Sequence, residues 1–253
     1  MYPVLFHIGS LEVRAWGVMV AFGIMAGSLL AGRLARKRGL NGDLIQEFVI
    51  YAIVAGLLGS RLWEVVFSWS KFVDNPASAL AFWSGGLSIQ GAVAGGLLAA
   101  IWFIRKHKLN FWEFADILAP GVILGQAIGR IGCFLNGDAY GIPAKSWFGV
   151  VYKPGTPAYD MYGATPLIPA ELLEGAGDLA ILGILLFLFR RKAFNGLTAL
   201  SYFVLYSLLR FALEFWRGDS LIMTGTLKAA QVSSLAIALA AAVMIVVKLR
   251  KTA

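Results

Sequence analysis

Three arginines lie in stretches that are apolar enough to be buried in a lipid bilayer. They are Arg61, Arg130 and Arg210, three of the 22 basic residues of the chain. A charged side chain at the centre of a membrane helix costs at least about 2.5–3.5 kcal/mol on insertion scales. Such a residue is retained where it faces the interior of a helix bundle and has a function there. We therefore expect Arg130 and Arg210 to bind an anionic group, whereas for Arg61 pairing with Glu64, three residues further on, is the favoured explanation and substrate binding the alternative.

Acidic and aromatic residues accompany these arginines at helical spacing. One predicted helical face carries, at positions i, i+4, i+8 and i+11, the residues Tyr206, Arg210, Glu214 and Arg217. A second predicted face carries, at positions i, i+3 and i+7, the residues Glu171, Glu174 and Asp178. The spacing of Arg210 and Glu214 places them one turn apart, so we expect the carboxylate to pair with the guanidinium and orient it.

Two glycine-rich stretches interrupt the apolar pattern at one predicted membrane face. Residues 129–141 read GRIGCFLNGDAYG, and their four glycines with Asn136-Gly137-Asp138 predict the end of a helix. Residues 84–91 read SGGLSIQG. Exposed backbone amides beside an arginine suit an anionic head group. We expect the two stretches, together with Arg210 and Arg217, to form a cationic pocket for a phospholipid phosphate in the outer half of the bilayer.

Seven apolar stretches are available to hold these residues in a membrane. The chain is 59% hydrophobic and only 14% charged, and a transmembrane helix needs about 20 apolar residues. The predicted spans are residues 16–35, 44–68, 86–104, 111–135, 170–189, 197–216 and 229–247. The predicted fold class is an all-α polytopic membrane protein, with residues 1–253 as a single transmembrane domain. Small residues four apart, such as Gly23 and Gly27, are expected to let helices pack closely.

The lysines and arginines of the loops set the predicted orientation. Thirteen of them lie at the ends of spans 1, 3, 5 and 7 or just after these ends, and six lie on the other side. Because cytoplasmic loops carry the basic excess, the N-terminus is predicted outside and the C-terminus in the cytoplasm. This asymmetry explains the net charge of +8 without nucleic acid as a partner. The long extracytoplasmic loop between spans 4 and 5, residues 136–169, is expected to form a lid, with a passive connector as the alternative.

The chain offers few residues for other kinds of chemistry. Its one cysteine, Cys133, excludes a disulfide framework, and its two histidines exclude a histidine-rich metal site. We therefore expect neither a metal nor a cofactor.

These motifs resemble those of the prolipoprotein diacylglyceryl transferase family. The main match consists of Gly129-Arg130-Ile131-Gly132, Phe134, Asn136-Gly137-Asp138 and Gly141. Further matches, in the family's order, are Ser60-Arg61-Leu62, Gly85-Gly86-Leu87-Ser88, Pro169 with Leu172 and Glu174, Arg210-Phe211 with Glu214-Phe215 and Arg217, and Gln231 with Ser234. Five motifs in the right order are far more specific than one.

The resemblance implies a multi-pass enzyme of the bacterial cytoplasmic (inner) membrane that carries out the first step of lipoprotein maturation. It would move a diacylglyceryl group from phosphatidylglycerol to the lipobox cysteine thiol of a prolipoprotein signal peptide, with membrane lipid as its surroundings. The candidate catalytic residues are Arg130 and Arg210, which would stabilise the leaving phosphate, and Asp138 and Glu214, which are candidate bases for the thiol. The candidate substrate-binding residues are Arg61, Gly85, Gly86, Ser88, Gln90, Asn136, Gly137, Gly141, Tyr206 and Arg217.

Gln90 is the main departure from the family pattern. Family members carry a histidine there, often taken as the base, and a side-chain amide cannot take up a proton at neutral pH. Other departures are Cys133 for asparagine, Trp16 for tyrosine, Glu171 for glutamine and Leu173 for tyrosine. Either an acid replaces the histidine, or the field of the arginines alone lowers the pKa of the thiol. The alternative function is that of a divergent relative that binds phospholipid, or of a transferase with a different acceptor.

Overall fold

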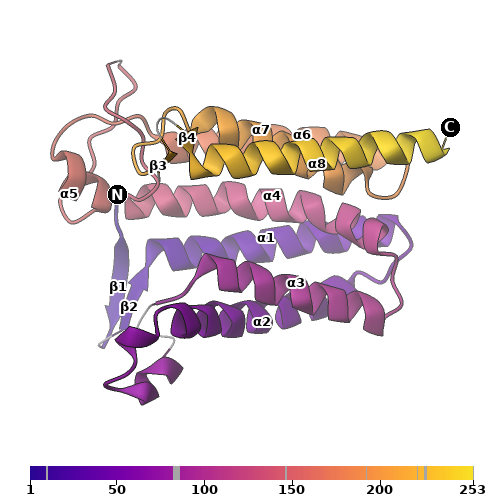
Figure 1. Ribbon diagram of the computed structural model, residues 1–253, viewed down its shortest axis with the longest axis horizontal. Helices are drawn as coiled ribbons and strands as arrows, with labels where there is room; N and C mark the ends of the chain where they lie inside the picture. The colour runs from indigo at the N-terminus through magenta and orange to yellow at the C-terminus, as the bar shows by residue number, and fades with distance from the viewer. Residues whose placement is uncertain are drawn as a thin grey trace. The chain divides into compact units, whose positions relative to one another are not determined.

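The structure is a computed structural model, shown in Figure 1. It describes residues 1–9, 11–81, 86–145, 147–191, 193–220, 222–224 and 227–252. The described residues form eight α-helices, two short 3-10 helices and two antiparallel hairpins. The chain divides into two compact units, Met1–Ala31 with Ala115–Ala253, and Gly32–Phe114.

The long helices follow the predicted spans, with every end within five residues of its predicted place. They are α1 (Ala15–Lys37), α2 (Asp43–Phe67), α3 (Ile89–Lys106), α4 (Phe111–Asn136), α6 (Ala170–Arg191), α7 (Leu197–Leu213) and α8 (Ala229–Thr252). Among the described residues, five of these helices, α1, α2, α4, α6 and α8, are long and apolar enough to cross a membrane, and α7 is a shorter apolar helix. The chain is therefore a helical, multi-pass membrane protein, and the count of seven spans stays a prediction.

The prediction of a purely α-helical chain missed two small hairpins. Strand β1 (Val4–Ile8) pairs with β2 (Leu11–Arg14), and β3 (Ile222–Thr224) pairs with β4 (Leu227–Lys228). Each strand has five residues or fewer. Although Leu11–Arg14 alternates between apolar and polar residues, runs of two to five residues are too short for such a pattern to identify a strand with certainty.

The predicted loop over residues 136–169 has a small core of its own. It contains the short helix α5 (Pro157–Tyr162), which begins with a proline and is capped by the Thr156 hydroxyl. The buried residues of this core are Tyr140, Tyr152, Ala158 and Leu167. The segment is thus more than an extended connector, although its predicted role as a lid stays untested.

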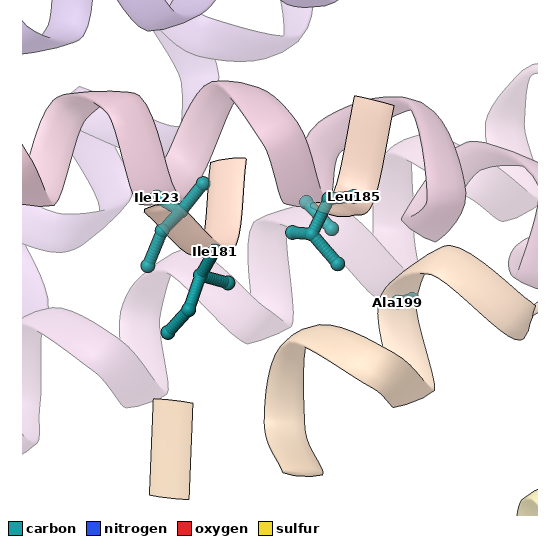
Figure 2. Packing of buried hydrophobic residues seen from close by; sticks show 5 residues of the cluster. Ile123, Ile181, Leu185 and Ala199 are labelled. Carbon is teal, nitrogen blue, oxygen red and sulfur yellow. The ribbon is translucent and has the colours of Figure 1, made fainter. Parts of the chain in front are cut away.

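In the unit that contains α6, α7 and α8, the apolar core joins α4, α6 and α7. Ile123 of α4 packs with Ile181 and Leu185 of α6 and with Ala199 of α7 (Figure 2). The start of α7 is fixed to α4 by Asp116, whose carboxylate accepts hydrogen bonds from the backbone N–H groups of Gly196 (2.7 Å) and Ala199 (2.9 Å). A carboxylate at a helix N-terminus satisfies amides that have no partner within the helix.

The same unit brings the backbones of α1 and α4 into contact. A Cβ atom added to Gly23 would lie 2.8 Å from the carbonyl oxygen of Gly125, and one added to Gly121 would lie 2.5 Å from that of Gly27. These two pairs, called the glycine seam below, confirm that the predicted small-residue spacing serves close helix packing.

The unit Gly32–Phe114 is built on α2 and α3, which also approach at glycines. A Cβ atom added to Gly91 would lie 2.5 Å from the Cβ atom of Trp63. The unit also contains a cluster of three aromatic rings. The ring centroid of Phe48 lies 5.5 Å from that of Phe103 and 5.2 Å from that of Phe114. Close backbone packing and aromatic contacts therefore hold this unit together.

Candidate functional site

Helix α6 turns three carboxyl groups toward the interior of its unit. Glu171, Glu174 and Asp178 are 0, 1 and 0% exposed. Their spacing predicted one shared face, and the burial of all three confirms it. A buried ionised carboxylate is stable only when it is paired or hydrogen-bonded, so the role of each acid depends on the groups that it contacts.

Glu174 is the centre of a polar cluster, called the Glu174 cluster below. Its Oε1 lies 2.6 Å from Nη2 of Arg130 on α4 and accepts a hydrogen bond of 3.2 Å from the Tyr206 hydroxyl on α7. Its Oε2 lies 3.5 Å from Nη1 of Arg217, which follows α7. One carboxylate thus binds two guanidinium groups and a phenol. The sequence singled out Arg130, Tyr206 and Arg217 as site residues, and the structure brings these three together.

The second carboxylate of this cluster is Asp219, which the sequence analysis missed. Both of its oxygens bind Arg217, with Nε–Oδ1 at 2.9 Å and Nη2–Oδ2 at 2.6 Å. Two parallel bonds of this kind fix the plane of a guanidinium. The only feature of the sequence that pointed to Asp219 was its position two residues after Arg217.

Gly141 and Gly218 allow three chain segments to meet beside Arg217. The Gly141 N–H donates to the Ile168 carbonyl (2.9 Å), and the Gly218 N–H donates to the Tyr140 carbonyl (3.0 Å). A Cβ atom added to Gly141 would lie 2.5 Å from the Ile168 oxygen, and one added to Gly218 would lie 2.7 Å from the Gly141 oxygen. Close backbone approach therefore explains both glycines, and the Gly141 amide is already hydrogen-bonded within the protein.

The predicted break after α4 is confirmed, because that helix ends at Asn136. The Asn136 amide donates to Oδ2 of Asp138 at 2.7 Å. Gly137 has a φ of +74°, and a Cβ atom added to it would lie 2.5 Å from the Cβ atom of Thr156. The other Asp138 oxygen, Oδ1, is buried and makes no hydrogen bond to the described residues. The three predicted residues thus form a tight turn.

Arg210 and Glu214 form the ion pair that their spacing predicted. Nη1 of the arginine lies 2.7 Å from Oε2 of the glutamate, although the two groups are not aligned as a hydrogen bond. The Glu214 side chain is 2% exposed and that of Arg210 is 20% exposed. Helix α7 ends at Leu213, so the prediction that Arg217 shares its helical face is wrong. The chain turns at Glu214, and Arg217 instead bridges to Gly141.

The loop over residues 136–169 is attached to α6 through Tyr152. Its hydroxyl is 2.8 and 2.9 Å from the two carboxylate oxygens of Glu171. Burial, with the adjacent Glu171 carboxylate, raises the pKa of the Tyr152 phenol well above its usual value. The phenol therefore keeps its proton and donates a hydrogen bond to the carboxylate. No pattern in the sequence pointed to this pair, because the two residues are 19 positions apart in different elements.

Arg61 lies in the unit Gly32–Phe114 and binds backbone carbonyl groups there. Its guanidinium donates to the carbonyls of Ala79 (2.9 Å), Gly86 (3.0 Å) and Ser78 (2.6 Å). The planar fork of arginine suits several carbonyls at once. Arg61 thus fixes the segment that leads to the second glycine-rich stretch, and its predicted contact with substrate stays untested.

The remaining predicted residues lie near the start of α3 in that same unit. The Ser88 hydroxyl donates to Oε1 of Gln90 at 2.6 Å, and Gln90 is exposed. Gly86 has a φ of +69°, whereas Gly85 lies outside the described residues. The predicted phosphate pocket draws on residues of both units and stays a prediction. Among the described residues, no group of three His, Cys, Asp or Glu side chains is placed to hold a metal ion.

Five helices of the described residues are able to cross a membrane, and two arginines on apolar helices pair with buried carboxylates. These features define the class of the protein as a multi-pass membrane protein with ion pairs among its helices. The chain belongs to the prolipoprotein diacylglyceryl transferase family, whose model matches residues 3–247. The family that the motifs indicated is thereby confirmed, and with it the class of enzyme, a transferase.

Several relatives named phosphatidylglycerol–prolipoprotein diacylglyceryl transferase are similar along nearly the whole chain. That of Symbiobacterium thermophilum is 38% identical over 253 residues, which cover 99% of this chain and 94% of the relative. That of Acaryochloris marina is 39% identical over 235 residues, 92% of this chain and 85% of the relative. That of Bacillus velezensis is 33% identical over 251 residues, 98% of this chain and 93% of the relative.

Proposed function

We propose that this protein transfers the diacylglyceryl group of phosphatidylglycerol to the lipobox cysteine thiol of prolipoproteins, in the bacterial cytoplasmic membrane. The observation that carries the proposal is family membership over residues 3–247, with relatives of that activity matched over most of their length. The buried arginine–carboxylate pairs supply what such a reaction needs, a rigid set of positive groups inside a membrane protein.

In this reaction the thiol sulfur attacks the glyceryl carbon that bears the phosphate. A thioether bond forms, the carbon–oxygen bond to phosphate breaks, and glycerol phosphate leaves. The thiol proton passes to a carboxylate that acts as the base or, where the field of the arginines alone lowers the pKa of the thiol, to water. The phosphate oxygen gains charge as the bond breaks, so donors that are already fixed beside it lower the barrier.

Arg130 and Arg210 are the residues assigned to the phosphate. A guanidinium has five N–H donors, and Arg130 uses Nη2 toward Glu174. Both arginine side chains are 20% exposed, whereas the carboxylates that hold them are 1 and 2% exposed. The carboxylates therefore act as positioning residues, and the accessible edges of the guanidinium groups meet the substrate. Asp138 is better placed than Glu214 to accept the thiol proton, since Glu214 already pairs with Arg210.

The proposed topology has seven spans, with the N-terminus outside, the C-terminus in the cytoplasm and the loop over residues 136–169 as an outer lid of a single domain. The positions of the helices and the basic excess of alternate loops support it. Reporter fusions at Lys37, His107 and Lys192 are expected to report cytoplasm, and a fusion at Pro154 the outside. A cytoplasmic signal at Pro154 would contradict the topology without touching the chemistry.

The activity is tested with the purified protein reconstituted in membranes that contain phosphatidylglycerol. A lipobox peptide is added, and mass spectrometry follows the mass gain of one diacylglyceryl group on its cysteine. A peptide with serine in place of that cysteine is the matched control and should stay unmodified. A folded protein that gives no product with the cysteine peptide would overturn the proposal.

A second candidate function is favoured by Gln90, the residue at the position of the family histidine. This side chain lies exposed in the first turn of α3 and contacts Ser88. An amide there suits a divergent relative that binds phospholipid, or a transferase with another acceptor. Lipid bound without transfer to the lipobox peptide, or transfer to a different nucleophile in the same assay, would favour this candidate.

A further inference from the structure

The loop between α4 and α6 has a buried core and an exposed apolar tip. Tyr152 and Leu167 belong to the core, whereas Trp147 is 95% exposed and Phe148 is 43% exposed. The centroids of these two aromatic rings are 6.1 Å apart, and both residues lie in a turn. Neighbouring exposed aromatic side chains of this kind mark a surface that meets a membrane or another protein.

The ends of two long apolar helices fix the level of this tip. The Val150 N–H donates to the Leu167 carbonyl at 2.9 Å, and Leu167 is three residues before the start of α6 at Ala170. Trp147 is three residues before Val150, so it lies no more than about 10 Å from that residue. The loop begins directly after α4, which ends at Asn136. Because α4 and α6 are both able to cross a membrane, the tip is held close to the membrane surface.

The loop extends in two directions from these helix ends. The part that precedes α5, drawn in pink in Figure 1, reaches past the edge of α8 across the helix axes, whereas α5 lies further out along those axes. In a membrane protein the first direction is parallel to the bilayer surface, and the second leads into water. The two parts of one loop therefore have different surroundings.

The residues around the tip suit the head-group layer of a bilayer. Residues 141–156 contain two lysines, Lys145 and Lys153, and no acidic residue. Lys145 is exposed two residues before Trp147, and the Lys153 ammonium lies 4.3 Å from the ring centroid of Tyr2. Tryptophan joins an apolar ring to a polar N–H and is enriched at membrane–water interfaces. Lysine beside it is a common partner in such anchors, because its charge complements the lipid phosphates.

We propose that Trp147 and Phe148 form an interfacial anchor, which lies among the lipid head groups and holds the loop over residues 136–169 at the membrane surface. The partner is the bilayer surface as a whole and not one lipid in a binding site. The level of the tip and its two lysines favour the bilayer over a prolipoprotein as the occupant. The anchor goes beyond the proposed transfer reaction and does not depend on it.

The anchor is tested with spin labels on the full chain in lipid nanodiscs without substrate peptide. Cys133→Ser first removes the one natural thiol. A single new cysteine then carries the label, either Phe148→Cys at the tip or Asp160→Cys at an exposed position of α5. Oxygen dissolves in lipid and a nickel chelate stays in water, so the ratio of their collision rates with the label reports its surroundings. The oxygen-to-nickel ratio is expected to be severalfold higher at position 148 than at position 160.

Trp147→Ser should bring the ratio at position 148 down to that at position 160. The matched control is Met161→Ser, which removes an exposed apolar side chain from α5 and should leave the ratio at position 148 unchanged. A label at position 148 that stays in water, or a high ratio that survives Trp147→Ser, would overturn the anchor. A label that leaves water only when a lipobox peptide is added would overturn it too and assign the tip to the prolipoprotein. The transfer assay is separate: a chain without transferase activity contradicts the proposed function and leaves these ratios as expected.

Discussion

Glu174→Gln removes one negative charge from the centre of the Glu174 cluster and keeps the shape of the side chain. The change leaves Arg130 without its partner at 2.6 Å and Arg217 without its partner at 3.5 Å. Breaking a buried ion pair by removing one partner costs about 3–5 kcal/mol. The amide oxygen still accepts one hydrogen bond, and Asp219 still binds Arg217. We therefore expect a loss near the lower limit, about 3 kcal/mol in the free energy of unfolding.

The matched control is Glu171→Gln, three residues earlier on the same helix and equally buried. The hydrogen-bond partner of this carboxylate is the neutral Tyr152 phenol, which can donate to an amide oxygen as well. The expected loss is about 1 kcal/mol, the usual value of a neutral hydrogen bond. Denaturant unfolding of both variants in one detergent measures the difference. Equal losses, or a Glu174→Gln protein as stable as the wild type, would refute the assignment of the ion pairs as the support of the site.

Four further predictions concern the reaction and the loop. Arg130→Ala should lower the rate of lipid transfer by about 10²–10³-fold, and Arg130→Lys should restore only part of it because lysine lacks the planar fork; a normal rate in a folded alanine variant would make this residue purely structural. Asp138→Asn should slow transfer more at low pH than at high pH, since thiolate forms unaided as pH rises; a defect that is the same at every pH removes it from the role of base. Gly137→Ala should lower the thermal midpoint and Gly129→Ala, which has open space beside it, should not; equal midpoints would contradict the tight turn. Gln90→His should change the transfer rate by less than about tenfold, and a wild type without product beside an active histidine variant would favour the lipid-binding relative.

Much of the helical framework was predictable because membrane helices are read from the length of apolar runs. The seven predicted stretches coincide with seven helices of the structure. Contacts within one helix were predictable as well, since a turn relates residues four apart. The pairing of Arg210 with Glu214 and the shared face of Glu171, Glu174 and Asp178 are of this kind.

Contacts between elements were not predictable, because spacing along one helix holds no information about its neighbours. Glu174 is 44 residues from Arg130, and neither its helical face nor the family match pointed to this partner. The hydrogen bonds of Arg61 to backbone carbonyls 17–25 residues away had no signal in the sequence. The end of α7 at Leu213 was missed by three residues because Phe215 and Trp216 continue the apolar pattern beyond it.

The glycine seam has a consequence for how the chain is made. Helix α1 begins at Ala15, and α4 begins about a hundred residues later at Phe111. A ribosome adds about 5–20 residues per second, so α1 enters the membrane about 5–20 s before its partner is synthesised. No hydrophobic driving force brings the helix face of Gly23 and Gly27 to its partner, because lipid tails are as apolar as a protein interior. During this interval Gly23 and Gly27 of α1 can pack against any other helix that carries small residues four positions apart. The risk of wrong pairing at this seam is therefore set by the order of synthesis.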